Sequence, residues 1–586
     1  MEDMPSPLVR MALFPDLLVK IWPAERVVEG MMVCRTLRPG LFEAPLVKIR
    51  ANSIVSDVEA ASRFLHRFTG TVELQCGESV ENPRGVRGRA KRPPTEQLTL
   101  PAHEATPFLI EGVPAEFGVQ EADEGPRPLN MGSSVMKLVH HAAMRDGGDG
   151  GWRGLGSLAL RNVEAPPSLL FDLCRWAIPK LPCITTIDLE GNQLPPNTVT
   201  ALLGSLTKLP NLSTLSLDNC RVGEAGIVHL CVCLPQLTAL TDLNLSRSAF
   251  RANSNTDDLA YALSRCSRLA SLNLSNNHLG TAQWFQQLAS ALPNMSSLTR
   301  LNLASTSEGF GLVAGSLPCC QHLRHLDLSG NAIRAQGAKD LAEWLKQCVC
   351  LETLVLSNNL FGEDGTSILM HGIPGIPTTL KSLFLADAGI GPEGAGLLAK
   401  VLPTCEGLEV LDVSYNGLGK DGMTLLAKAL PRCPRLRVLR VGHAQCGNDA
   451  GVPVAEALPA CTRLEELDLS SNGFSALGAW KLAWGLPVTL QSLNLTNNVI
   501  GDVGARYFAG ALPHCNALRD LNLAGTGVGD EGAVYMAEAV PRCLGLKRLN
   551  LSNTVIGAHG ARLLVSCLER CVFPPELVLE GILHTC

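Results

Sequence analysis

The chain has 586 residues, of which 49 are Lys or Arg and 55 are Asp or Glu, so its formal net charge at pH 7 is −6. This balance argues against a protein that coats nucleic acid or an anionic membrane surface. Because 46% of the residues are apolar and only 18% are charged, the chain is not disordered throughout. No run of 18 consecutive apolar residues indicates a membrane span, and the first residues lack the pattern of a secretory signal. We therefore expect a cytoplasmic protein, with the nucleus as the alternative.

The N-terminal segment, residues 8–45, predicts a small helical module. Two short amphipathic stretches, 13–22 and 27–38, are separated by Pro23. Their arrangement resembles an F-box, the module by which substrate receptors dock onto a cullin-type ubiquitin ligase. The resemblance implies docking through five positions: Pro15, Leu18, Ile21, Val33 and Cys34. The alternative is a helical cap that shields the first repeat of the array that follows.

Residues 46–76 predict a strand, a helix and a second strand, which is the content of one degenerate repeat. Residues 77–151 are rich in Gly and Pro without a sustained period, and we interpret them as an irregular linker. The basic run at 84–92 has no aromatic residues between its charges. It is therefore interpreted as part of the solvated linker rather than as a nucleic-acid site or a nuclear-import signal.

From residue 155 to 573 the pattern L-x-x-L-x-L-x-x-N/C-x-L recurs. Its first position falls at 155, 184, 212, 240, 269, 298, 323, 351, 380, 408, 436, 464, 490, 518 and 546, which makes fifteen units. A self-similar period of this length is typical of a solenoid, in which each unit packs only against its neighbours. Residues 574–586 are expected to form a C-terminal cap.

Each unit divides into two halves with different periods. In the unit at 408, Leu411 and Val413 alternate with polar residues, which predicts a short strand with both side chains in the core. The ninth position, Asn416 here, is suited to bonding backbone groups of adjacent turns. Residues 419–431 have apolar positions three and four apart and end in Pro, which predicts an amphipathic helix.

The 21 cysteines show the same periodicity as the leucines. Eight of them stand three residues before the first leucine of a unit: Cys266, Cys320, Cys348, Cys405, Cys433, Cys461, Cys515 and Cys543. A constant phase indicates that each thiol fills the same small apolar niche. We expect these cysteines to be free rather than joined in disulfides or bound to metal.

These repeats resemble the leucine-rich-repeat family, in particular its ribonuclease-inhibitor-like subclass with units of 28–29 residues. The resemblance implies an α/β solenoid, shaped like a horseshoe, with a concave parallel β-sheet and convex helices. Motifs that would mark an enzyme, such as H-E-x-x-H, G-x-S-x-G or an EF-hand loop, are absent from the sequence. We therefore expect a non-enzymatic protein with no cofactor, no catalytic residues and no metal site.

A concave binding patch is predicted in the units that begin at 351, 380, 408 and 436. Most exposed strand positions of the array hold Ser, Thr, Asn or Asp, whereas these units place larger side chains there. Neighbouring strands are about 4.8 Å apart, so such residues can form one surface. The predicted patch consists of Val355, Phe384, Asp387, Tyr415, Arg440 and His443. Aromatic and Arg side chains are frequent anchors of protein interfaces.

The predicted function is a protein-binding scaffold that holds a protein partner on its concave face and binds neither nucleic acid nor a membrane. A working F-box would make it the substrate receptor of a ubiquitin ligase, with the ligase adaptor as a second partner. The alternative is a regulatory leucine-rich-repeat protein of the Ran-type GTPase-activating or innate-immune-receptor kind, which the family resemblance also allows.

Overall fold

A computed structural model of the chain describes residues 155–163, 166–251, 254–279, 282–306, 317, 320–373 and 379–581, together with the backbone of 46–50 and 71–76. The chain divides into two compact units, unit 1 at Met1–Ala249 and unit 2 at Phe250–Cys586. The predicted F-box-like module at 8–45 and the linker at 77–151 lie outside the described residues.

Unit 1 is built from parallel strands and the helices that connect them. Its described strands are β1 (Leu46–Arg50), β2 (Thr71–Cys76), β3 (Leu155–Leu160), β4 (Thr186–Asp188), β5 (Thr214–Ser216) and β6 (Asp242–Asn244). Its described α-helices are α6 (Pro167–Asp172), α7 (Pro196–Leu206) and α8 (Gly223–Cys233). Because β1 and β2 pair in parallel with each other, and β2 with β3, they extend the sheet of the regular repeats. The interpretation of 46–76 as one degenerate repeat stays a prediction, since its helix is not among the described residues.

Unit 2 repeats the same strand and helix many times. Its described strands are β7 (Ser271–Asn273), β8 (Arg300–Asn302), β9 (His325–Asp327), β10 (Thr353–Val355), β11 (Ser382–Phe384), β12 (Val410–Asp412), β13 (Val438–Arg440), β14 (Glu466–Asp468), β15 (Ser492–Asn494), β16 (Asp520–Asn522), β17 (Arg548–Asn550) and β18 (Glu576–Val578). Its described α-helices are α9 (Ser254–Ser264), α10 (Ala282–Ala291), α12 (Ala335–Leu345), α13 (Gly362–Gly372), α14 (Gly391–Val401), α15 (Gly419–Ala429), α16 (Gly451–Ala457), α17 (Ala476–Gly485), α18 (Gly501–Ala511), α19 (Asp530–Ala539) and α20 (Ala558–Leu568). Strand β18 lies in the segment predicted as a C-terminal cap and pairs with β17.

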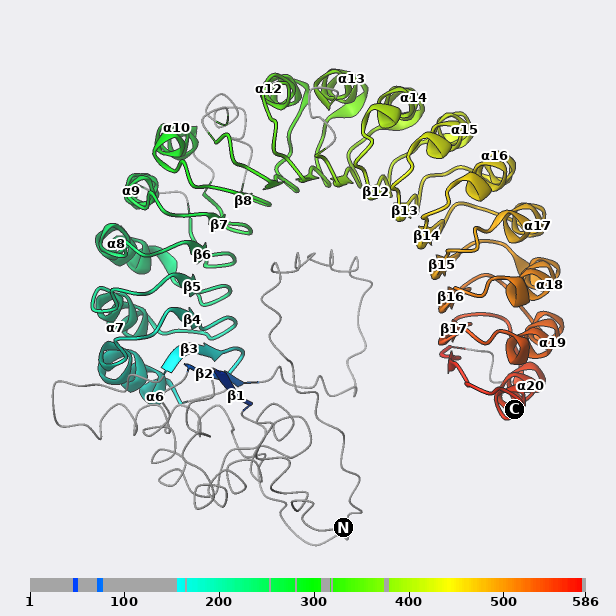
Figure 1. Ribbon diagram of the computed structural model, residues 1–586, viewed down its shortest axis with the longest axis horizontal. Helices are drawn as coiled ribbons and strands as arrows, with labels where there is room; N and C mark the ends of the chain where they lie inside the picture. Colours follow the sequence, from blue (N-terminus) through cyan, green and yellow to red (C-terminus); the bar gives the residue numbers. More distant parts are fainter. Residues whose placement is uncertain are drawn as a thin grey trace, which may run out of the picture. The chain divides into compact units, whose positions relative to one another are not determined.

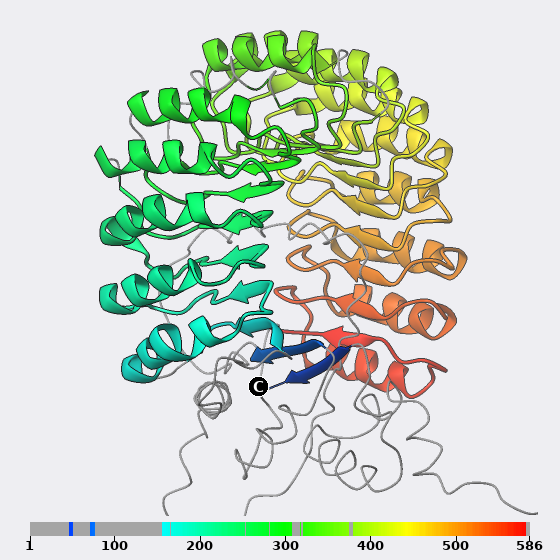
Figure 2. The ribbon, with the colours of Figure 1, turned by 60° about the vertical axis from the view of Figure 1, so that its left-hand side comes forward.

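The strands of unit 2 form the inner, concave layer of an arc, and the helices form its outer layer (Figure 1). Figure 2 shows the same stacking from another side, with successive coils lying one upon another. Equivalent leucines of neighbouring strands are in register, so that Leu383 pairs with Leu411 and Leu411 with Leu439. All three are 0% exposed. No unit encloses these side chains alone, so neighbouring coils share one continuous core. The fold is a leucine-rich-repeat solenoid.

The ninth position of the repeats forms the predicted asparagine ladder. The Asn331 amide nitrogen Nδ2 donates hydrogen bonds to the carbonyl oxygens of Leu303 in the preceding coil and Leu328 in its own coil, at 2.7 and 3.0 Å. Its Oδ1 accepts from the backbone N–H of Thr306 at 2.9 Å. Each such asparagine therefore satisfies buried backbone groups of two coils, which water cannot reach.

The periodic cysteines are mostly buried and form no disulfides. Cys266, Cys320, Cys348, Cys405, Cys433 and Cys461 are at most 7% exposed, and none of the cysteines in the described part of the chain is joined in a disulfide. The Cys433 thiol donates to the carbonyl of Ala429 at 3.7 Å, and burial raises its pKa from 9.0 to about 12. Such thiols are packing residues and not nucleophiles. The remaining two of the series, Cys515 and Cys543, are half-buried.

In the described part of the chain, no helix combines the length and the apolar composition that crossing a membrane requires.

Candidate protein-binding surface

The structure aligns the fifth position of successive coils into one row across the concave sheet of unit 2. In this row Val355 pairs with Phe384, Phe384 with Asp412, and Asp412 with Arg440. The next member is Asp468 on β14. Three residues of the predicted patch, Val355, Phe384 and Arg440, therefore lie in one row, on β10, β11 and β13, with Asp412 of β12 between the last two.

The expectation that Phe384 faces solvent is wrong, because the residue is only 5% exposed. Its neighbours in the row, Val355 and Asp412, stand one strand away on either side. At a strand separation of about 4.8 Å, a broad ring between two side chains is covered by them and by the sheet below. Phe384 therefore supports the surface from beneath and is not a contact residue, whereas Val355 is partly exposed.

A second row is formed by the eighth position of each coil, and its backbone is left-handed throughout the described repeats. The φ angles are +56° at Asn358, +51° at Asp387, +58° at Tyr415, +55° at His443 and +52° at Ser471. Left-handed backbone favours Gly, Asn and Asp, which explains the small polar residues at this position in most coils. Tyr415 and His443 are bulky exceptions to that preference.

Tyr415 and His443 form an exposed stacked pair. Their ring centroids are 4.3 Å apart and the rings are inclined by 11°. Tyr415 is 52% exposed, which is unusual for a large aromatic residue. The pair presents a flat aromatic surface to solvent above two neighbouring strands, and Asp387 stands exposed one coil earlier. The left-handed backbone belongs to this position in every described coil, so what distinguishes these two coils is the pair of rings that they expose.

Arg440 supplies a fixed positive charge beside this stack. Its Nε donates to the Glu466 carboxylate at 2.8 Å, and the side chain is 32% exposed. Burial alone would lower the pKa of Arg440, but Glu466, Asp412 and Asp468 raise it above its ordinary value. Burial raises the pKa of Asp412, against the opposing hydrogen bonds from Ser414. The surface thus combines an aromatic plate, a held guanidinium and surrounding carboxylates.

The residue just before each strand, at the second position of the coil, belongs to a separate row in which side chains of opposite charge pair with one another. Glu352 accepts from both Arg324 and Lys381 of the flanking coils. Arg437 forms a two-bond ion pair with Glu465 at 2.8 and 2.9 Å. Because these charges already have opposite charges on neighbouring coils, this part of the row links repeats and is less suited to bind a partner.

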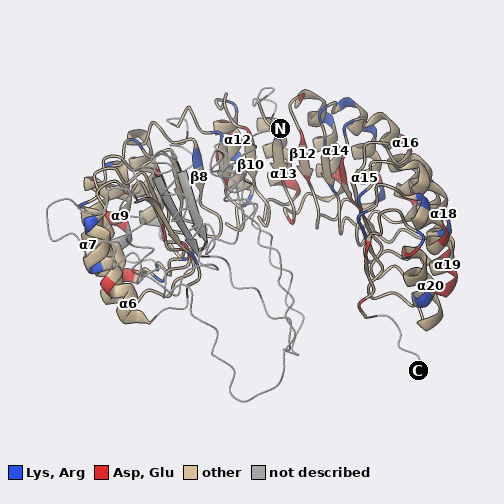
Figure 3. Ribbon diagram, turned by 60° about the horizontal axis from the view of Figure 1, so that its bottom comes forward, with Lys and Arg blue, Asp and Glu red and all other residues tan. Residues whose placement is uncertain are grey.

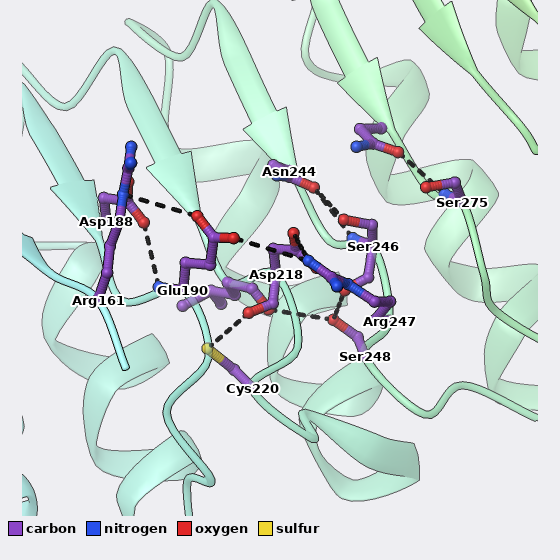
Figure 4. Close-up of polar contacts among 12 residues, drawn as sticks. Arg161, Asp188, Glu190, Asp218, Cys220, Asn244, Ser246, Arg247, Ser248 and Ser275 are labelled. Atoms are coloured by element: carbon purple, nitrogen blue, oxygen red, sulfur yellow. Dashed lines mark hydrogen bonds and ion pairs between the residues drawn. The ribbon is translucent and has the colours of Figure 1, made fainter. Parts of the chain in front are cut away.

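Unit 1 carries a charged network that the sequence analysis did not single out (Figure 4). Arg161 donates to Asp188 at 2.7 Å, and Arg247 forms a two-bond pair with Asp218 at 2.6 and 2.8 Å. Glu190 lies between them, 3.6 Å from each guanidinium. One signal in the sequence could have pointed to it, since Arg247 occupies an eighth position, with φ of +50°, where most other coils have Gly, Asn, Asp or Ser.

Glu190 is the unfavourable member of this network. Burial, followed by the charges of Asp218 and Asp188, raises its pKa above the ordinary value, against the lowering effect of the two arginines. A carboxyl group with a raised folded-state pKa contributes stability below its unfolded pKa, and that contribution is lost as the pH rises through the folded pKa.

Glu190→Gln is therefore expected to stabilise unit 1 at pH 7 and to have no such effect near pH 3, where the carboxyl group is already neutral. The gain is small, under about 1 kcal/mol, because the group is largely screened by solvent. Hydrogen-exchange mass spectrometry of strands β4 to β6 in the full chain measures it. Asp218→Asn is the control and has the opposite effect, since it breaks the buried pair with Arg247. A loss of protection in Glu190→Gln at pH 7 would contradict the sign.

Among the described residues, no group of three or more His, Cys, Asp or Glu side chains is placed to hold a metal ion. The concave rows of unit 2 and the charged network of unit 1 present charged, aromatic and hydrogen-bonding groups on several strands of the sheet. Such an arrangement is suited to contact with another macromolecule.

Comparison with known proteins finds matches to leucine-rich repeats in unit 2. A family model described as "Leucine Rich repeat" matches residues 319–342, 377–399, 405–427, 460–483, 488–509 and 514–537. The ribonuclease inhibitor of Mus musculus is 28% identical over 140 residues, a stretch that covers 19% of this chain. The chain spans about a third, 31%, of the length of that curated relative. A solved internalin from Listeria monocytogenes is similar over 77% of this chain and 95% of its own, with 15% identity and a TM-score of 0.35. Six segments of unit 2 thus match the leucine-rich-repeat model, and part of the chain is similar to ribonuclease inhibitor.

Proposed function

We propose that this protein is a non-enzymatic scaffold that binds another protein on the concave sheet of unit 2. The observation that carries the proposal is the exposed stack of Tyr415 on His443, which sits in left-handed backbone next to the held guanidinium of Arg440. Tyr and Arg are enriched among the residues that dominate binding energy at interfaces. The similarity to a protein named ribonuclease inhibitor supports a role in gripping a protein partner.

The test replaces each anchor by the residue that other coils use in the same row. Asn is found in the eighth position at Asn358 and Asn497, where φ is +56° and +57°. It also occupies the fifth position at Asn494 and Asn522. The triple variant Tyr415→Asn, Arg440→Asn, His443→Asn therefore removes the anchors while keeping residues that both rows accept.

In this variant, the amount of partner that co-purifies with the full chain is expected to fall by about tenfold or more, the loss typical of removing interface hot spots. Quantitative mass spectrometry of the co-purified proteins measures the loss. Tyr261→Ala is the matched control, because Tyr261 is 68% exposed on α9 and lies outside the sheet. An unchanged set and amount of partners in the triple variant would refute the proposed surface.

A finer proposal is that the bound protein is presented to a ubiquitin ligase. It is supported by the F-box-like pattern of residues 8–45. An adaptor of this kind needs only two binding sites on one chain, because it acts by bringing two proteins into proximity. Deleting residues 8–45 then abolishes co-purification of a ligase adaptor and leaves capture at the concave sheet intact. If no ligase adaptor is bound by the intact chain, this part of the proposal fails while the binding surface stands.

A reducing compartment, the cytoplasm or the nucleus, is the proposed location. The support is the set of 17 cysteines in the described part of the chain that form no disulfide, most of them buried where oxidation would disrupt packing.

A further inference from the structure

Helix α17 exposes an apolar stripe on the outer layer of unit 2. Its inner face packs Ala479, Leu482 and Ala483 into the core, as expected for a helix of the array. Its outer face carries Leu477, Trp480 and Trp484, which are 56, 37 and 65% exposed. Residues at i, i+3 and i+7 share one side of a helix. The outer side of a surface helix is normally polar, and an exposed apolar stripe such as this one is typical of a site that binds another molecule.

The stripe continues onto the two following helices, which lie beside α17 on the outer side of the arc (Figure 1). The ring of Tyr507 on α18 is 6.2 Å from that of Trp480, centroid to centroid. Tyr535 on α19 lies under the guanidinium of Arg506, at 5.6 Å. We name Leu477, Trp480, Trp484, Tyr507 and Tyr535 the convex aromatic patch.

Two cations lie over aromatic rings of the patch. The Lys481 ammonium lies 4.1 Å from the centroid of Trp480, and Arg506 lies over Tyr535. Within the described residues, neither cation forms an ion pair, and the sequence of α17 contains no acidic residue. Both charges are therefore held on aromatic faces and remain open to an anion from outside. The complementary surface is apolar with acidic flanks.

We propose that the convex aromatic patch docks an amphipathic α-helix of a partner protein, with its apolar face on Trp480 and Trp484 and with Asp or Glu residues beside Lys481 and Arg506. A helix fits because neighbouring helices present ridges and grooves into which another helix packs. This site is independent of the concave surface and remains whether or not that surface binds a protein.

The charges favour such a helix over the two other possible occupants. In a twofold dimer this surface would meet itself, so Lys481 and Arg506 would find opposite charges only at Glu531 and Glu538 beside Tyr535. An anionic membrane would meet Glu531 and Glu538, which are exposed on either side of Tyr535. Figure 3 shows acidic as well as basic positions on the outer helices around α18 and α19. Membrane attachment also takes several basic residues beyond the two present here. A single helix laid along α17 avoids those carboxylates.

The experiment selects binders for the full chain from a displayed library of helical 18-residue peptides whose charged and apolar positions are randomised. The same selection is run on Trp480→Ser/Trp484→Ser, and the enriched peptides are titrated by isothermal calorimetry. We expect enrichment of peptides with one apolar face and acidic flanks, and affinity about tenfold or more weaker for the double variant.

Two further variants distinguish binding at the convex aromatic patch from non-specific hydrophobic binding. Trp176→Ser is the matched control, because Trp176 in unit 1 is 49% exposed and lies 5.4 Å from the guanidinium of Arg175; binding is expected to be unchanged. In Lys481→Glu/Arg506→Glu the preference is expected to change from acidic to basic flanks. This variant keeps both tryptophans and therefore remains informative if the serine variant unfolds.

Several outcomes overturn the proposal. One is that no peptide is enriched on the full chain relative to Trp480→Ser/Trp484→Ser. Another is that the enriched peptides lack an apolar helical face. A third is that Lys481→Glu/Arg506→Glu selects peptides with the same charge preference as the unchanged protein. Patch-dependent dimers in sedimentation would assign the surface to a second copy instead. Patch-dependent binding to vesicles containing phosphatidylserine would assign it to a membrane.

Discussion

Asn416→Ala is expected to lower the free energy of unfolding of unit 2 by about 3 kcal/mol or more, because it leaves several buried backbone groups without partners. The Asn416 Nδ2 donates to the carbonyls of Leu385 and Val413 at 2.7 and 3.0 Å. Its Oδ1 accepts from the backbone N–H groups of Ala388 and Ile390 at 3.1 and 3.0 Å. The side chain is 1% exposed, so water cannot replace these bonds.

The neighbouring coils make this position more sensitive than other members of the ladder. Both hold alanine at the ninth position, Ala388 before and Ala444 after, so no adjacent amide takes over the lost bonds. Urea unfolding followed by circular dichroism measures the change. Asn516→Ala is the control, since Asn516 is exposed in a turn and its loss is expected to stay within about 0.5 kcal/mol. A loss below about 1 kcal/mol at Asn416 would contradict the ladder as a source of stability.

Gly372→Ala is expected to destabilise unit 2 by about 1–3 kcal/mol, although alanine is the better helix former. A Cβ at Gly372, near the end of α13, would lie 2.6 Å from the Cα and 2.9 Å from the carbonyl oxygen of Ala342 on α12. Those are backbone atoms, so the two helices must move apart. The close approach of neighbouring helices is thus part of how the coils stack.

Gly510→Ala is the matched control and is expected to have the opposite sign. Gly510 lies in α18, and nothing stands within 4 Å of a Cβ added there. Alanine at this site should therefore stabilise the protein by about 0.5–1 kcal/mol through helix propensity. Thermal and urea unfolding of the two variants measure both effects. Equal signs at Gly372 and Gly510 would show that helix spacing does not limit the fold.

The sequence was sufficient to predict the structural features that depend on the period of the repeat. A leucine at a constant phase faces the same core in every coil, so the strand register of Leu383, Leu411 and Leu439 follows from spacing alone. The asparagine ladder and the buried cysteines follow for the same reason. Each of these features is set by a position within the repeat, and the sequence displays positions directly.

Features that depend on how one side chain lies against another were harder to predict. The spacing places Phe384 on the concave face but does not show that its neighbours cover the ring, which is 5% exposed. Likewise, the stacking of Tyr415 on His443 depends on a left-handed eighth position, which becomes visible only with the backbone. Departures from the repeat pattern were the useful signal. Arg247 is such a departure too, but its part in the charged network of unit 1 became visible only with the structure.

The outer face of α17 was missed for a related reason. Apolar residues in its sequence predict a helix packed on the core, and both Trp480 and Trp484 fit that interpretation. The sequence does not show that the core side is already filled by Ala479, Leu482 and Ala483. Only the packing reveals that the two tryptophans remain outside.

The most direct test of the central claim places a photo-activated benzophenone side chain at position 415 of the full chain, with position 261 as the control. If the concave sheet of unit 2 holds the partner, illumination joins position 415 to the same protein whose co-purification is lost in the variant Tyr415→Asn, Arg440→Asn, His443→Asn. Position 261, on an outer helix, then gives no such product. Cross-linking of that protein from position 261 but not from position 415 would contradict the account.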